Sequence, residues 1–198
     1  VKVTRGDADI IIATREGNAI RFNETDVRPM GRTASGVKSI HLKDNDVAVC
    51  MDIAVKGEDL LVISENGFGK RTPITEYKVQ RRGGTGLITY KISEKTGKVV
   101  GATVCKLDDE LMLINTSGVA IRINVSDISV TSRSAMGVTL MRTSDEEKIA
   151  AIAKISGSNE EKEEQLTLEE SNEINEIESS SVDIENEVDM VSDLDDIE

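Results

Sequence analysis

Three short apolar runs, spaced about 50 residues apart, dominate the hydrophobic pattern of this chain. They occupy residues 9–14, 59–64 and 110–115, and each begins with an acidic residue followed by four apolar ones. Runs of this length that are rich in Ile, Val and Leu are typical of buried β-strands. Each run is followed by a dipeptide, such as Asn66-Gly67, that favours a tight hairpin turn. Each run therefore predicts an inner strand that turns back into a second strand.

The same order of residue types continues beyond each turn, so the chain is a threefold internal repeat. A third strand is expected after a second glycine, at Val37, Leu87 and Val138, and a fourth near residues 47–52, 99–104 and 149–154. The other positions in register are a turn glycine (Gly17, Gly67, Gly118), an arginine (Arg21, Arg71, Arg122), a later arginine (Arg32, Arg82, Arg133) and the second glycine (Gly36, Gly86, Gly137). We therefore predict an all-β, propeller-like fold of four-stranded blades, with repeats at about 9–58, 59–109 and 110–157.

Charge separates this predicted domain from the rest of the chain. The whole chain of 198 residues has a net charge of −13. Residues 158–198 hold 17 Asp and Glu against one lysine, whereas residues 1–157 hold 23 Lys and Arg against 20 Asp and Glu. The tail is also poor in apolar side chains, so we predict that residues 158–198 are disordered. A mildly basic body joined to an acidic tail suits a partner that is a polyanion.

Several functional classes find no support in the sequence. No stretch approaches 18 apolar residues, and the first nine residues lack the apolar core of a signal peptide, so we expect a cytoplasmic protein and no membrane partner. The two cysteines, Cys50 and Cys105, and the one histidine, His41, are too few for a zinc site, and the cysteines are expected to be buried. No phosphate-binding loop and no catalytic pair occurs. We predict neither catalytic residues, metal nor cofactor in this chain.

The segment Gln80-Arg81-Arg82-Gly83-Gly84-Thr85-Gly86 is the most informative one for function. Arginines supply forked donors that fit phosphate oxygens, and glycines let a backbone approach a partner closely. Such a loop suits a nucleic-acid backbone that is held without reading its sequence. The predicted DNA-binding residues in this segment are Gln80, Arg81, Arg82, Gly83, Gly84 and Gly86.

Equivalent positions in the other repeats extend this candidate site. If the repeats form a ring, cations at matching positions line one curved rim, and such a rim bends DNA through its backbone. The return strands, the equivalent loops and the third strands add to the predicted site Arg21, Arg28, Arg32, Lys70, Arg71, Lys91, Arg122, Arg133 and Arg142.

The Gln80–Gly86 segment resembles the seven-residue box of the C-terminal domain family of DNA gyrase A subunits, Gln-Arg-Arg-Gly-Gly-(Lys/Arg)-Gly. Six of the seven positions match, and Thr85 replaces the usual basic residue. The resemblance covers residues 7–155 and implies a β-pinwheel, in which blades exchange strands and a basic rim wraps DNA. It also implies that the chain works with a B subunit, and with the rest of an A subunit, in an A2B2 assembly on the bacterial nucleoid. ATP and Mg²⁺ would be used by other parts of that enzyme, which introduces negative supercoils.

Two departures from the family pattern bear on this resemblance. The family usually has six blades, so three repeats indicate the C-terminal part of such a domain. The box also lies in the middle repeat, although the main box of the family belongs to the first blade, so Gln80–Gly86 can be a later copy.

Two alternatives remain open from the sequence. The equivalent domain of topoisomerase IV has similar blades but usually degenerate boxes, so the preserved Gln80–Gly86 segment favours gyrase. A protein-interaction propeller is the other, and the aromatic content of 2% argues against it because docking faces usually use aromatic anchors.

Overall fold

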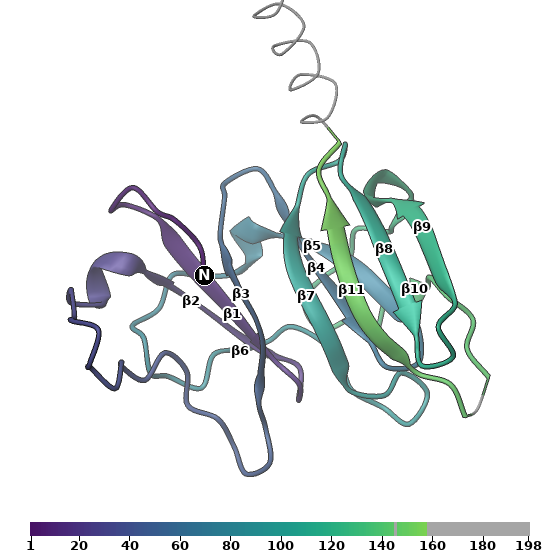
Figure 1. The fold of residues 1–198 in the computed structure, drawn as a ribbon, viewed down its shortest axis with the longest axis horizontal. Helices are drawn as coiled ribbons and strands as arrows, with labels where there is room; N and C mark the ends of the chain where they lie inside the picture. The colour runs from purple at the N-terminus through teal and green to yellow at the C-terminus, as the bar shows by residue number, and fades with distance from the viewer. Residues whose placement is uncertain (145, 158–198) are drawn as a thin grey trace, which may run out of the picture. The chain divides into compact units, whose positions relative to one another are not determined.

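The computed structural model describes residues 1–144 and 146–157. Residues Val1–Ser156 form one compact unit, shown in Figure 1. The predicted disorder of the acidic tail, residues 158–198, lies outside the described residues. Among the described residues, no helix has the length and apolar character needed to cross a membrane.

The described residues form short strands, as the repeat pattern predicts, and each repeat also has a single turn of 3₁₀ helix that the pattern did not predict. The first repeat contains β1 (Asp9–Thr14), β2 (Asn18–Asn23), η1 (Glu24–Asp26) and β3 (Ala48–Ile53). The second contains β4 (Asp59–Ser64), β5 (Phe68–Pro73), η2 (Ile74–Glu76), β6 (Leu87–Ile88) and β7 (Val99–Cys105). The third contains β8 (Glu110–Asn115), β9 (Ala120–Asn124), η3 (Val125–Asp127), β10 (Val138–Thr139) and β11 (Ile149–Ile155).

The strands form three antiparallel sheets that exchange strands between repeats. Their orders are β3-β1-β2-β6, β10-β5-β4-β7 and β11-β8-β9. The short strand β6 of the second repeat thus completes the first sheet, and β10 of the third repeat completes the second. The all-β, pinwheel-like prediction is confirmed.

Two details of the predicted blades are wrong within the described residues. The expected third strand of the first repeat is not formed at Val37, and the third sheet has three strands instead of four. Both differences follow from the exchange of strands, in which a third strand pairs with the sheet of the preceding repeat. Within the described residues, Val37 has no preceding sheet to join, and the third sheet has no following repeat to supply its fourth strand.

Close backbone approach allows this exchange. Gly17 and Gly86 both have positive φ, at +79° and +73°. A Cβ atom at Gly17 would collide with the carbonyl oxygen of Tyr90, and one at Gly86 would collide with that of Ala19. These two glycines are therefore required by the junction between the first two repeats, as well as by their own turns.

The hydrophobic core lies mainly between neighbouring sheets. Side chains alternate between the two faces of a strand, so Ile11 packs toward the second sheet while Ile12 packs on the opposite face of the first. In the same way Leu60 packs toward the first sheet and Leu61 toward the third. The second sheet is covered by another sheet on both of its faces, which is why its opening run, residues 60–63, is continuously apolar and fully buried.

The cysteines follow the prediction in part. Cys105 is buried between the second and third sheets, and Cys50 is half-buried. Burial raises the pKa of both thiols to about 12, so both are neutral at physiological pH.

The return-strand arginines join each repeat to the next. The guanidinium of Arg71 pairs with Asp59 at 2.8 Å and donates to the carbonyl oxygen of Ile128 at 2.8 Å. Arg21 is placed in the same way: it pairs with Asp9 at 2.8 Å and donates to the carbonyl oxygens of Ile74 and Tyr77. Each arginine thus satisfies the carbonyls of the 3₁₀ turn in the following repeat.

Lys70 makes a second polar junction. Its ammonium group donates to the carbonyl oxygens of Ser132 and Arg133 and lies 5.7 Å from the ring centre of Tyr90. The hydroxyl of Tyr90 donates to the carbonyl oxygen of Met136 at 2.6 Å. Lys70 and Tyr90 therefore hold the loop 131–137 of the third repeat against the second repeat.

We predict that Arg71→Ala lowers the free energy of unfolding by about 3 kcal/mol, because it removes a buried guanidinium and leaves the half-buried Asp59 carboxylate without its partner. Urea unfolding of the 198-residue chain measures this loss. The matched control is Arg122→Ala, at the same position of the third repeat. Arg122 pairs with Glu110, but its side chain is 56% exposed, so this loss should be about 1 kcal/mol or less. Equal losses for the two variants would contradict the assignment.

We predict a pH effect from Lys70. Burial lowers the pKa of its ammonium group to about 8, from an ordinary 10.5; the nearby Glu76 opposes this shift and Arg133 adds to it. Between these two pH values the unfolded chain holds a proton that the folded chain has lost, so stability rises with pH.

Lys70→Ile removes the titrating group and introduces isoleucine, which Ile20 shows to be the residue at this position in the first repeat. The difference in unfolding free energy between wild type and this variant should be constant below pH 8 and should grow in favour of wild type from pH 8 to 10.5. A difference that stays constant over that range would rule out the effect.

Candidate nucleic-acid interface

The loop 79–86 lies against the return strand of the first sheet. Val79 forms a parallel bridge with Arg21, and the N–H of Gln80 donates to the carbonyl oxygen of Arg21 at 2.7 Å. The loop 130–137 of the third repeat is held identically on the second sheet, where the N–H of Thr131 donates to the carbonyl oxygen of Arg71 at 2.8 Å. The two loops therefore occupy equivalent places on successive sheets.

The two arginines of the box-like segment have different roles in the structure. The guanidinium of Arg82 donates to the carbonyl oxygens of Asp26 and Lys38, both at 2.9 Å. Arg133, at the same position of the third repeat, likewise donates to the carbonyl oxygen of Ile88 at 3.2 Å. Arg81 is exposed to solvent. The second arginine thus fixes the loop, and the first projects from it.

The glycines of the Gln80–Gly86 segment make contacts inside the domain that the sequence does not predict. The N–H of Gly83 donates to the carbonyl oxygen of Ser39 at 2.7 Å, and the carbonyl oxygen of Gly84 accepts from the N–H of His41 at 2.8 Å. Gly86 is required for the close approach to Ala19. The N–H of Gly83 is thus already bonded within the domain and is not available to a partner.

Burial also corrects three residues of the predicted site, Arg21, Lys70 and Arg71. Lys70 is fully buried, and Arg71 is 5% exposed. Their donors are directed at carbonyl oxygens and at Asp59 inside the domain, so neither side chain can reach a phosphate. Arg21 has a side chain that is only 16% exposed and has the same internal role. The idea that the return-strand arginines of the first two repeats point outward is therefore wrong.

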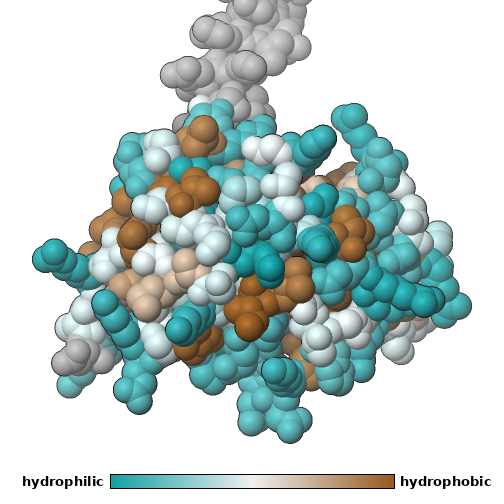
Figure 2. Space-filling model, turned by 180° about the vertical axis from the view of Figure 1, so that it is seen from behind, coloured by the Kyte–Doolittle hydropathy of each residue, from teal (hydrophilic) through white to brown (hydrophobic). Residues whose placement is uncertain are grey.

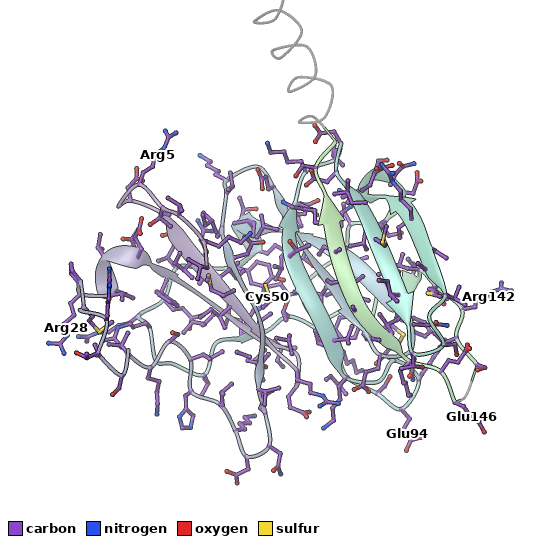
Figure 3. All side chains as sticks on the ribbon, in the orientation of Figure 1. Arg5, Arg28, Cys50, Glu94, Arg142 and Glu146 are labelled. Carbon is purple, nitrogen blue, oxygen red and sulfur yellow. The ribbon has the colours of Figure 1, made fainter. Side chains whose placement is uncertain are left out.

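The remaining predicted cations lie at the surface. Figure 3 shows Arg28 and Arg142 projecting from opposite ends of the compact unit. Arg122 is also exposed, although it pairs with Glu110. The exposed cations of the predicted site, apart from Arg122, are Arg28, Arg32, Arg81, Lys91 and Arg142. They come from all three repeats.

The sequence analysis missed two exposed cations beside these loops. Lys78 lies just before the loop 79–86, and Lys38 lies where the third strand of the first repeat is expected. The available signal was the alternation of a strand, which places Lys38 on the opposite side from the apolar Val37. Neither lysine recurs in all three repeats, so a search for repeated columns does not find them.

Comparison with known proteins agrees with this architecture. The family model of the DNA gyrase C-terminal domain, beta-propeller, matches residues 8–49, 58–106 and 109–156. The chain is 58% identical, over 177 residues, to the DNA gyrase A subunit of Clostridium acetobutylicum, a match that covers 89% of this chain and 21% of that protein. It is 42% identical, over 158 residues, to the DNA gyrase A subunit of Staphylococcus epidermidis, covering 79% and 18%. The chain thus spans about a fifth of the length of these curated relatives.

Solved structures show the same fold. A structure of the DNA gyrase A C-terminal domain aligns with a TM-score of 0.72 at 31% identity, covering 77% of this chain and 52% of that one. The C-terminal domain of DNA topoisomerase IV aligns with a TM-score of 0.80 at 23% identity, covering 86% and 53%, and this likeness concerns the fold alone. With three matched repeats and the exchanged strands that join them, the chain belongs to the DNA gyrase C-terminal domain family.

Proposed function

We propose that this chain binds duplex DNA without sequence preference and bends it, as the C-terminal part of a gyrase A subunit. The observation that supports this most directly is the set of exposed cations that the three repeats contribute: Arg28, Arg32, Arg81, Lys91 and Arg142. Guanidinium and ammonium groups neutralise phosphates, and contacts to phosphates position a protein on DNA without reading bases.

The rigidity of the loops supports bending. Arg82 and Arg133 attach successive loops to the preceding repeat through hydrogen bonds to its carbonyl oxygens. The loop of the third repeat is also held by hydrogen bonds from Lys70 and Tyr90 of the second repeat. Cations carried on a fixed, curved surface compensate for the elastic cost of bending DNA, because each additional phosphate contact becomes available only in the bent form. Mobile loops would follow straight DNA instead.

The proposal extends to the complete gyrase of which this chain would be a part. In that enzyme, the chain acts with the rest of the A subunit and with the B subunit. The assembly is A2B2 and works in the cytoplasm on the bacterial chromosome. The chain contributes DNA wrapping to negative supercoiling by a type II topoisomerase. ATP hydrolysis and Mg²⁺ chemistry belong to other parts of that enzyme, and no catalytic step is assigned to this chain.

The alternatives are less well supported. Topoisomerase IV remains a candidate by fold, but the 58% identity to a gyrase A subunit favours gyrase. A protein-docking propeller needs exposed aromatic anchors. The chain has two tyrosines and two phenylalanines and no tryptophan. Tyr77, Tyr90 and Phe22 are buried, and Phe68 is half-buried.

We predict a steep salt dependence of DNA binding. If the five exposed cations each neutralise one phosphate, log K against log salt should have a slope of roughly −4 to −5. Fluorescence anisotropy with duplexes of unrelated sequence measures this slope.

Arg81→Ala should weaken DNA binding equally for every duplex and should make the slope of log K against log salt shallower by about 1. Arg5→Ala is the matched control, because Arg5 is an exposed arginine outside the three loops (Figure 3) and should change little. Binding that does not depend on salt would refute the proposal.

We also predict that the acidic tail competes with DNA. Residues 158–198 hold 17 acidic residues and one lysine, so they can occupy the same cations that bind phosphates. A chain that ends at Gly157 should bind DNA more tightly than the full chain at low salt, and the difference should shrink as salt is added. Equal affinities at low salt would show that the tail has no such role.

A further inference from the structure

Val79 and Val130 occupy the same place on successive sheets. Val79 forms a parallel bridge with Arg21 of β2, and Val130 forms one with Arg71 of β5. In both cases the N–H of the next residue donates to the carbonyl oxygen of that arginine. The opposite edges of β2 and β5 pair with β1 and β4. Both valines therefore lie along the outer margin of their sheets, at the start of the loops that cross between repeats.

The side chains of these two valines are exposed, by 53% for Val79 and 51% for Val130. The second repeat, to which Val79 belongs, has a repeat bonded to it on each side. Its Arg82 donates to the carbonyl oxygen of Lys38 in the first repeat, and its Ile88 accepts from Arg133 of the third. Val79 is thus exposed with both neighbouring repeats in place, so its exposure is a property of the repeat itself.

The backbone at these positions does not require an apolar side chain. Valine suits the extended backbone of a bridge because it is β-branched, but threonine has the same shape and replaces one methyl group by a hydroxyl. Exposed sheet edges are more often protected by charged side chains. An apolar side chain is favoured over threonine where a partner removes it from water. The two valines therefore mark points that a partner covers.

The residues around each valine indicate what kind of partner this is. The positions just before and two after the valine are exposed in both repeats: they are Lys78 and Arg81 in the second and Ser129 and Ser132 in the third. Cations and hydroxyls both donate to phosphate oxygens. Cations on a sheet edge also discourage pairing with another protein strand. The surroundings thus favour a nucleic-acid backbone over a protein, and the valine recurs where the charge does not.

The backbone of a DNA duplex offers two kinds of surface. Phosphates accept hydrogen bonds, and the deoxyribose rings between them present carbon–hydrogen groups. A protein surface that fits this backbone places small apolar side chains among its donors. Figure 2 shows such a mixture on the side of the compact unit that is hidden in Figure 1, where separate apolar patches lie among hydrophilic side chains.

We propose that Val79 and Val130 pack against deoxyribose rings of the duplex that the surface cations hold. This inference rests on the proposed DNA binding and adds to it a contribution that salt does not weaken. Neutralising a phosphate releases counterions, whereas covering an apolar side chain releases none. The contact carries no sequence preference, because the sugar is the same in every nucleotide of DNA.

Fluorescence anisotropy of the 198-residue chain with duplexes of unrelated sequence, measured over a range of salt, tests this inference. The variant Val79→Thr/Val130→Thr keeps the shape of both side chains and removes apolar surface. Its affinity should fall on the order of tenfold, from about fourfold for each methyl group that is no longer buried. The slope of log K against log salt should stay that of wild type, so the two lines should be parallel.

Two further variants separate this contact from a structural effect. Val79→Ile/Val130→Ile keeps the β-branched shape and adds apolar surface, so it should bind at least as tightly as wild type. Val55→Thr is the matched control, because Val55 is an exposed valine in the turn between β3 and β4. It should bind like wild type. Circular dichroism and urea unfolding check that all the variants are folded.

The outcomes distinguish this inference from the proposed function on which it rests. Wild type that binds with a steep salt dependence, together with a double threonine variant of equal affinity, would overturn the inference and leave the proposed function standing. A loss accompanied by a shallower slope, or an equal loss in Val55→Thr, would also overturn the inference. Wild type that does not bind duplex DNA would remove both.

Discussion

The structure depends on the addition of a short strand from each repeat to the sheet of the repeat before it. An open sheet of three short strands has an unpaired edge on each side, and unpaired N–H and C=O groups are costly when they are buried. β6 and β10 pair with part of one of these edges, on β2 and β5, from outside the repeat. Because the added strand comes from the next repeat, pairing of the backbone and packing of the sheets occur together. A repeat of this kind is not a complete structural unit, and its neighbours complete it.

The loops that carry the surface cations follow directly from this exchange. Residues 79–86 connect η2 of the second repeat to the strand that it adds to the first sheet, so they have to cross the junction. At the crossing, Arg82 bonds to carbonyl oxygens of the first repeat and Arg81 projects into solvent. The junction therefore repeats the same loop and its fixing arginine, Arg82 or Arg133, at the two described junctions. The outward cation does not recur in the same way, because Ser132 stands in the third repeat where Arg81 stands in the second.

Arginine has two separate uses in this chain, and burial separates them. Arg71 is desolvated between Asp59 and carbonyl oxygens, where its fork of donors joins two repeats. Arg28 and Arg142 are solvated and project from the surface. The same side chain is suited to both, because it remains charged when buried and still offers several donors. Lys70 shows the contrast, since burial lowers the pKa of its ammonium group to about 8.

The sequence by itself determined the repeat, its strands, the hairpin turns and the division of charge between body and tail, because these depend on local periodicity and composition. It also located the loop at Gln80–Gly86. It could not determine which arginines are exposed, because Arg21 and Arg71 lie on strands whose outer face becomes a junction only when the next repeat packs on it. Nor could it show that Val37 forms no strand, since that strand requires a sheet from another repeat. Tertiary structure decided these points, because burial and strand pairing arise from contacts between repeats that are about 50 residues apart in the chain.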